Sequence, residues 1–451
     1  MDDVAEDSEQ SSEREIGMNR SGWLSTAAVA LVAFYLGKSL GPARIVFPDP
    51  KEGRTAEEME SEVGKALAEP RAFVRASALI RLFEGLTNEN VSGAAHAIDS
   101  RASENDPVDL QMFLTAWAHL DPVAALQEVQ RSSIQSRKEL GLRVIMREWA
   151  ASGDTLAAGN YFDTLTDPDQ RRVVAGPLVR GWALSGDVDG ALALARRLFE
   201  IHPRWEVIDG LVRGVLHGQG AGSTLRMARS LNPQMDATID PPRSGEFDQK
   251  VILTTLDLAG RDDPKAATVV YDAFAGLEAP PAWLLPSLAP LADQMARSEP
   301  EAAIEWLLPK TEGPERSLAL MDATGTWADR DFDAAWAWFE KRNPSAHDPK
   351  SDLAPTESDL LAGLLRWMAK TRPTEAARWS ILLRPESNRI ETFRRVAYFW
   401  SRTNAKGADE WISTLQLDPT QLALVREAAE WGPNRRDELA GERRASPDGG
   451  N

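Results

Sequence analysis

The chain has 451 residues, a formal net charge of −18 and no cysteine. The charge argues against nucleic acid as a partner, because proteins that bind nucleic acid need a basic surface to neutralise phosphates. The lack of cysteine excludes disulfide bonds, thiolate metal sites and cysteine nucleophiles. Fifteen Trp stand against four Tyr, and this ratio predicts either a repeated core position or an aromatic binding surface.

Residues 1–21 form an acidic segment with seven Asp and Glu against two Arg. Such a segment cannot bury enough apolar surface to offset the entropy lost on ordering. We therefore predict a disordered tail.

An uncharged, largely apolar run follows and predicts a single transmembrane helix over residues 22–40. No charged residue lies between Arg20 and Lys38, and Trp23 and Tyr35 lie near the two ends, as aromatic residues do at membrane interfaces. With Lys38 snorkelling, the run is about long enough to cross the hydrocarbon core. Two alternatives stay open, namely a cleaved signal peptide and a buried helix of a soluble domain.

Residues 41–54 contain three Pro and two Gly and are predicted to be a linker between the membrane helix and a soluble domain. The charges that flank the run do not fix its orientation. Long domains cross membranes largely regardless of their charge, and we expect a single-pass protein whose soluble domain is extracytoplasmic.

From residue 55 to residue 431 the apolar residues recur at the helical period, and no stretch alternates as a strand does. This pattern predicts an all-α domain. In residues 432–451 the apolar pattern stops and Gly, Pro, Asp and Arg dominate, which predicts a second disordered tail.

A cassette recurs through the helical region. A large apolar residue is followed four or five residues later by Gly-Asp, Asp-Pro or Glu-Pro, and then by two small residues. Gly permits a left-handed helix end, Asp caps the next helix, and Pro suits its first turn. The small pair lets the second helix approach the first. The clearest copies are Trp117…Asp121-Pro122…Ala124-Ala125, Trp149…Gly153-Asp154…Ala157-Ala158 and Trp182…Gly186-Asp187…Gly190-Ala191.

The large residues of these cassettes act as repeat anchors, and most are separated by 32 to 37 residues. A period in this range is typical of repeat architectures. We therefore predict an α-solenoid of about ten helix-turn-helix repeats, with longer turns at residues 232–247 and 343–355. The tryptophan anchors are Trp117, Trp149, Trp182, Trp327, Trp367 and Trp400, and the remaining anchors are Phe83, Val215, Leu258 and Met295.

Two units, Trp149…Gly153…Ala158 and Trp182…Gly186…Ala191, carry an aromatic residue, Gly and Ala at the spacing of the tetratricopeptide repeat. The region from residue 74 to residue 430 resembles a divergent tetratricopeptide-like or Sel1-like array. It departs from that pattern where Trp replaces Tyr and where Asp-Pro or Glu-Pro replaces Gly. The resemblance implies a superhelix of helix pairs with a concave surface that binds peptides or proteins, and a scaffold or assembly role without catalysis.

The sequence offers no catalytic, cofactor-binding or metal-binding motif. None of the five His lies four residues from another His, as metal-binding pairs on a helix require. Gly218-x-Gly220-x-Gly222 follows a helical run rather than a strand, so we interpret it as a turn between helices and not as a dinucleotide loop. We predict no cofactor, no metal and no enzyme.

Four other tryptophans are candidates for binding a partner. Trp205 and Trp283 lie off the anchor positions, and Trp336 and Trp338 are about 200° apart on a helix, so they cannot share one face. The sequence thus predicts a membrane-anchored scaffold or assembly factor whose partners are proteins or peptides. The alternative is binding or processing of a cell-wall glycan by exposed Trp rings.

Overall fold

The computed structural model describes residues 53–100, 107–201, 203–233, 245–276, 280–343, 353–384 and 388–431. Within these ranges the regular secondary structure is helical and no strand occurs, so the predicted all-α class is confirmed for the part described. The segments predicted as an acidic tail (1–21), a transmembrane helix (22–40), most of the linker (41–54) and a C-terminal tail (432–451) lie outside the described residues.

No helix in the described ranges is both long and apolar enough to span a membrane. The described residues divide into two compact units, the first ending at Gly218 and the second beginning at Gln219. Each unit is considered by itself below.

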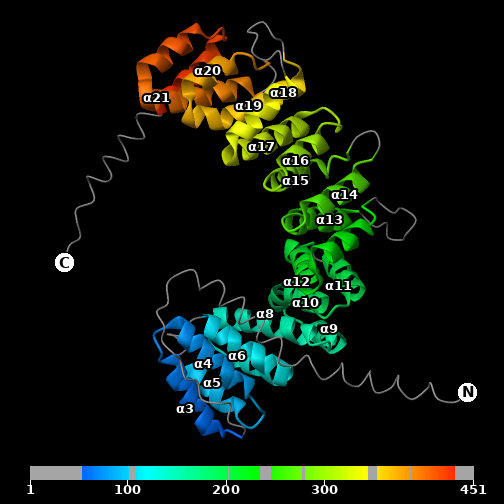
Figure 1. Ribbon diagram of the computed structural model, residues 1–451. Helices are drawn as coiled ribbons and strands as arrows, with labels where there is room; N and C mark the ends of the chain where they lie inside the picture. The colour runs from blue at the N-terminus through cyan, green and yellow to red at the C-terminus, as the bar shows by residue number, and fades with distance from the viewer. Residues whose placement is uncertain are drawn as a thin grey trace, which may run out of the picture. The chain divides into compact units, whose positions relative to one another are not determined.

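In the first unit α4, α6, α8 and α10 pack against one another in succession, α3 packs against α5, and α7 and α9 each pack against the helices before and after them (Figure 1). The most extensive contacts join α8 to α10, α3 to α5 and α6 to α8. Its helices are α3 (Ala56–Leu67), α4 (Ala72–Glu84), α5 (Val91–Ser100), α6 (Pro107–Leu120), α7 (Pro122–Arg131), α8 (Gln135–Ala151), α9 (Thr155–Thr164), α10 (Pro168–Leu184), α11 (Val188–Ile201) and the first part of α12 (Trp205–Arg229).

The second unit repeats this pattern, with its most extensive contacts between α17 and α19 and between α15 and α17. After the remainder of α12 come α13 (Glu246–Gly260), α14 (Pro264–Ala275), the short 3₁₀ helix η1 (Leu285–Ser287), α15 (Leu288–Ala296), α16 (Pro300–Leu307), α17 (Pro314–Arg330), α18 (Phe332–Arg342), α19 (Pro355–Thr371), α20 (Pro373–Ser380) and α21 (Arg389–Thr414). Residues 419–431 are also helical.

Two of the cassette turns are closed by a tryptophan and an aspartate. Gly153 and Gly186 have φ of 96° and 99°, the left-handed conformation that glycine adopts without strain. At the second turn, the Trp182 indole Nε1 donates to Asp187 Oδ2 at 2.8 Å, and Asp187 Oδ1 accepts from the backbone N of Gly190 at 2.9 Å. One carboxylate therefore fixes the anchor ring of one helix and caps the next helix.

The turns without glycine use an aspartate cap instead. Asp121 accepts from the Ala124 backbone N at 2.9 Å, and Asp263 accepts from the Ala266 backbone N at 3.0 Å. Both stand directly before a proline at the start of a helix. Glu299, which also precedes a proline, makes no such bond, because its longer side chain does not fold back on the helix end as that of Asp does.

Small residues let the helices approach closely. The second small residue of each cassette is fully buried, namely Ala125, Ala158, Ala191, Ala267, Ala303 and Ala335. Glycines do the same between alternate helices: a Cβ added at Gly181 would lie 2.1 Å from the carbonyl O of Arg147, and one at Gly363 would lie 2.6 Å from that of Met321. Backbone thus lies directly against backbone at these positions.

The segment Gly218-x-Gly220-x-Gly222, which the sequence predicts to be a turn between helices, does break a helix. Gly220 has φ 79° and ψ 173° inside α12, so the two parts of α12 are separate helices. A second break occurs at Asn404 in α21, where φ is −154° and ψ is 85°. The Asn404 Oδ1 accepts from the Gly407 backbone N at 3.0 Å, so this residue caps the second part of α21.

The described chain enters its first helix through a capping box. Thr55 and Glu58 exchange side-chain to backbone hydrogen bonds of 3.0 and 3.2 Å, which satisfies two donors at the start of α3. Arg54, assigned to the linker by its composition, is buried and pairs with Glu62 at 2.8 Å. Arg54 therefore belongs to the packed unit.

Candidate functional site

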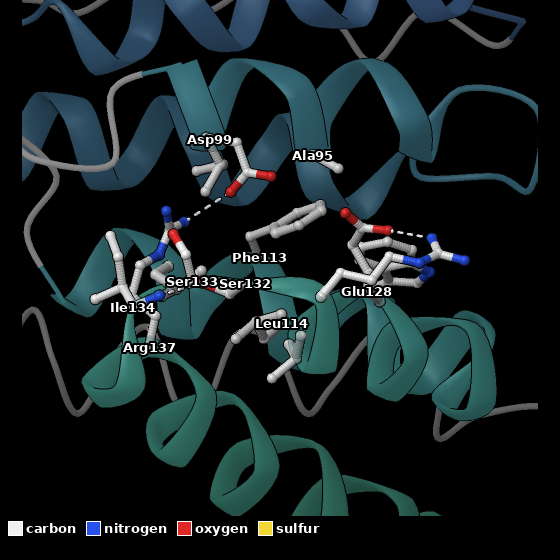
Figure 2. A pocket seen from close by; sticks show the side chains of 14 residues that line it. Ala95, Asp99, Phe113, Leu114, Glu128, Ser132, Ser133, Ile134 and Arg137 are labelled. Atoms are coloured by element: carbon white, nitrogen blue, oxygen red, sulfur yellow. Dashed lines mark hydrogen bonds and ion pairs between the residues drawn. The ribbon is translucent and has the colours of Figure 1, made fainter.

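A cavity of about 270 Å³ lies in the first unit between α5, α6, α7 and the start of α8. Figure 2 shows its interior with Phe113 at the centre. The lining residues are Ala95, Ile98, Asp99, Leu110, Phe113, Leu114, Trp117, Glu128, Val129, Arg131, Ser132, Ser133, Ile134 and Arg137.

The floor of the cavity is apolar and well ordered by ring contacts. The Phe113 ring lies 5.3 Å from the ring of Trp117, one turn later on α6, and 5.5 Å from the ring of Phe83 on α4. Phe113 and Leu114 are almost completely buried. These contacts hold α6 in one orientation, because aromatic pairs at 4.5–7 Å add to the stabilisation from burial.

Two ion pairs line the rim. Asp99 at the end of α5 pairs with Arg137 of α8, with 3.0 Å between Oδ1 and Nη2. Glu128 pairs with Arg131 within α7, with 2.8 Å between Oε2 and Nη1. Asp99 and Arg137 lie on one side of Phe113 and Glu128 lies on the other (Figure 2). The charged groups are therefore already neutralised, and the rim offers polar contacts without a net charge.

The turn between α7 and α8 forms one wall of the cavity. Ser132 ends α7 in an extended conformation, and its Oγ accepts from the Ile134 backbone N at 3.3 Å. The following Ile134 is 40% exposed, which is unusual for a large aliphatic side chain next to an apolar cavity. This turn leaves apolar surface of the cavity open to a partner.

The size and chemistry of the cavity limit what it can hold. Small-molecule and cofactor sites usually measure about 300–1,000 Å³, so this cavity suits one or two side chains of a bound segment better than a cofactor. The apolar residues that form the floor of the cavity cannot titrate. The acidic and basic residues of the lining pair with one another, Asp99 with Arg137 and Glu128 with Arg131. Across the described ranges, no group of three or more His, Cys, Asp or Glu is placed to hold a metal ion.

Five tryptophan anchors pack against another aromatic ring, namely Trp117, Trp149, Trp327, Trp367 and Trp400, and the Trp182 indole donates to Asp187. Trp117 and Trp149 are buried, while Trp182, Trp327, Trp367 and Trp400 are half-buried. Trp117 alone among them lines the cavity. In the second unit Trp367 stacks on Phe332, with 4.2 Å between centroids, and Trp327 lies 5.6 Å from Trp338.

The four candidate interaction aromatics have different surroundings. Trp205 at the start of α12 is 68% exposed. Trp283 is half-buried and meets the ring of Phe274 at 6.3 Å. Trp338 packs on the anchor Trp327 of the preceding helix. Trp336 lies 4.8 Å from Trp379 of α20 and donates from Nε1 to Glu340 at 2.7 Å. Only Trp205 of the four is more than half exposed.

The other lining residues of the cavity were not singled out by their sequence. Phe113 precedes the anchor Trp117 by one helical turn and resembles any core residue. Ser132-Ser133-Ile134 is a short turn whose single signal is an isoleucine between serine and glutamine, outside the apolar pattern of either helix. An apolar residue at the turn between two predicted helices was the observation that could have indicated this wall.

Comparison of the sequence and the fold with protein-family profiles, with curated proteins and with solved structures gives no match. The function must therefore be inferred from the residues of the chain itself.

Proposed function

We propose that the chain is a membrane-anchored interaction scaffold, built as an α-solenoid, and that the α5–α8 cavity receives an apolar side chain of a bound protein segment. The observation that carries the proposal is the cavity itself, which combines a rigid aromatic floor with an ion-paired rim and an exposed Ile134. Binding energy in protein interfaces is concentrated where an apolar anchor fills such a pocket and a polar rim surrounds it.

The packing of alternate helices supports the solenoid. In the first unit α4, α6, α8 and α10 pack against one another in succession, and in the second unit α13, α15, α17, α19 and α21 do the same. Repeat proteins form a continuous surface from short segments in this way. The anchor to the membrane rests on residues 22–40 of the sequence alone. Tethering there would raise the effective concentration of partners near the membrane.

The tryptophans favour a protein partner over a glycan. Sugar binding would use a row of exposed, coplanar rings, whereas most of these rings pack against other aromatic side chains at 4.2–6.3 Å. The exposed Trp205 has no second exposed candidate ring in contact with it among the ring pairs of the described residues. Protein binding therefore accounts better for the arrangement.

Site-specific photocrosslinking of the full-length chain in cells tests the proposal. A photoreactive amino acid replaces Ile134 at the cavity, and Leu156 on α9, which is 71% exposed, is the control position. We expect a defined set of proteins cross-linked from position 134 and not from position 156. Ser133→Trp, which fills the cavity, should abolish the cross-links, whereas Ser136→Trp should not. Equal protein capture at both positions would refute the proposal.

A further inference from the structure

Three arginines recur at one position of consecutive repeats in the first unit. Arg147, Arg180 and Arg213 are separated by 33 residues each, and each stands two residues before a repeat anchor. They belong to α8, α10 and the first part of α12. Residues at equal positions of stacked repeats face the same way, so the three side chains form a set, which we call the arginine column.

The helices that carry the arginine column touch through their backbones at this level. A Cβ added at Gly181, the residue after Arg180, would lie 2.1 Å from the carbonyl O of Arg147. A Cβ added at Gly214, the residue after Arg213, would lie 2.7 Å from the carbonyl O of Arg180. Because of these glycines, the helices that carry the three arginines lie in backbone contact with one another.

The two outer arginines are neutralised by nearby carboxylates. Arg147 Nε donates to Glu148 Oε1 at 2.8 Å, and Arg213 Nε donates to Asp209 Oδ1 at 2.7 Å. Burial raises the pKa of Glu148, but the hydrogen bond from His119 and the charge of Arg147 bring that pKa below its ordinary value. Glu148 is therefore ionised and engaged at neutral pH.

The central arginine has no carboxylate partner among the described residues. Arg180 Nη2 donates to His217 Nδ1 at 3.0 Å, which requires that this ring nitrogen carries no proton. The Arg180 Nε is buried, and no atom of the described residues accepts a hydrogen bond from it. The guanidinium of Arg180 thus carries a positive charge without a carboxylate partner in the described part of the chain, and carboxylates pair well with the planar fork of an arginine.

The electrostatic environment of Arg180 favours an added negative charge. Burial lowers the pKa of its guanidinium, and the positive charges of Arg147 and Arg213 lower it further, against the opposing effect of Asp209 and Glu148. In the second unit Arg366 pairs with Asp322, and Arg297 pairs with Asp293. The chain as a whole has a net charge of −18. This local excess of positive charge therefore differs from the rest of the chain and would favour binding of an anion.

We propose that the arginine column binds a carboxylate side chain of an acidic protein segment, with Arg180 as its direct contact. This inference rests on the scaffold function proposed above and names the chemistry of the partner. The three guanidinium groups of the arginine column and the carboxylates of Glu148 and Asp209 together leave one positive charge. A single carboxylate balances it, whereas a phosphoryl group carries about −1.5 to −2 at neutral pH and would exceed it.

Binding of labelled peptides to the purified full-length chain tests the arginine column. The probes are three fluorescent nine-residue peptides of Gly and Ser that carry a central Glu-Gly-Glu, Gln-Gly-Gln or phosphoserine motif, and binding is followed by fluorescence anisotropy. We expect the Glu peptide to bind more tightly than the Gln peptide, and added salt to weaken the binding because the charges are partly exposed. The phosphoserine peptide should bind no more tightly than the Glu peptide.

Variants then assign the contact. Arg180→Gln should weaken binding of the Glu peptide about tenfold or more, because hydrogen bonds to charged groups contribute strongly. Arg180→Lys should lie between, since lysine keeps the charge but not the fork. The matched control is Arg172→Gln, which removes the same charge from an exposed position of α10 and should change binding less than about twofold. Circular dichroism must show that all variants remain folded.

Three outcomes of these binding experiments would refute the inference. Equal binding of the Glu and Gln peptides, or equal loss in Arg180→Gln and Arg172→Gln, would overturn the assignment to the arginine column. Tighter binding of the phosphoserine peptide than of the Glu peptide would show that the arginine column is a phosphopeptide site instead. If any of these results occurs while the cross-links from position 134 persist, the arginine column is refuted and the scaffold function stands. Loss of the specific cross-links themselves refutes the scaffold function.

Discussion

Gly181→Ala should destabilise the first unit although alanine favours helices. Alanine in a helix interior is about 1 kcal/mol better than glycine. At position 181, however, the new Cβ would lie 2.1 Å from a backbone carbonyl O of α8. Because ordinary contacts lie near 3.5 Å, α10 would have to move away by about 1 Å, and a backbone atom cannot turn aside as a side chain does.

Overpacking of this kind costs about 1–3 kcal/mol, and the backbone contact places it at the upper end. After the helix-propensity gain, we expect a net loss of about 2 kcal/mol in the free energy of unfolding, or roughly 5 °C in Tm for a unit of this size. Gly64→Ala in α3 is the matched control, since no atom lies within 4 Å of its Cβ position. That variant should gain about 0.5–1 kcal/mol.

The assay is thermal and urea unfolding of the full-length chain, followed by circular dichroism and tryptophan fluorescence. The expected result is opposite signs for the same substitution in two helices of one unit. If Gly181→Ala is as stabilising as Gly64→Ala, the backbone contact between α8 and α10 does not exist as described. Arg147 and Arg180 would then not be held on touching helices, and the arginine column would lose its geometric basis.

Three further predictions concern single side chains. Tyr271→Phe should leave the free energy of unfolding unchanged or raise it by up to about 1 kcal/mol, because the hydroxyl is buried without a hydrogen-bond partner and burial raises its pKa to about 12; a clear loss in urea unfolding would contradict this. Asp187→Ala should cost about 1 kcal/mol, since both the Trp182 indole and the Gly190 cap lose their acceptor, whereas an unchanged Tm would show that the turn does not need the carboxylate. Burial raises the pKa of Asp359, so its ionisation opposes folding as pH rises through that pKa; Asp359→Asn should therefore have a higher Tm than the parent at pH 7 and lose this advantage below about pH 3.9, and a difference that does not vary with pH would refute the reasoning.

The local structure of the chain could be predicted from its sequence because the signals are themselves local. Gly153 and Gly186 adopt the left-handed conformation that their place between Trp and Asp indicated. Asp121 and Asp263 cap helices as an Asp-Pro pair predicts. The bond from Trp182 to Asp187 was not foreseen, although the two residues are always five apart in the Gly-Asp cassettes.

The cavity and the arginine column could not be predicted in the same way, because they depend on which helices meet. Asp99 and Arg137 come from helices separated by two others in the chain, and nothing in either segment indicates the pairing. The 33-residue spacing of Arg147, Arg180 and Arg213 was visible in the sequence. The chain has 51 Lys and Arg, so the spacing of three of them does not by itself indicate that they share a surface.

The 33-residue register of the first unit also determines how such a chain can grow. An in-frame duplication of one segment, from a point in α8 to the same point in α10, would reproduce the Trp-Gly-Asp turn, the glycine contact and one arginine together. A one-residue insertion, by contrast, would rotate every following side chain by about 100° and separate the arginine from its neighbours. The arginine column can therefore be lengthened only in whole modules of 33 residues, and each module would add one more arginine at a fixed spacing. The number of modules would determine how many arginines the column contains and how long an acidic segment it matches. The affinity of any single module would not.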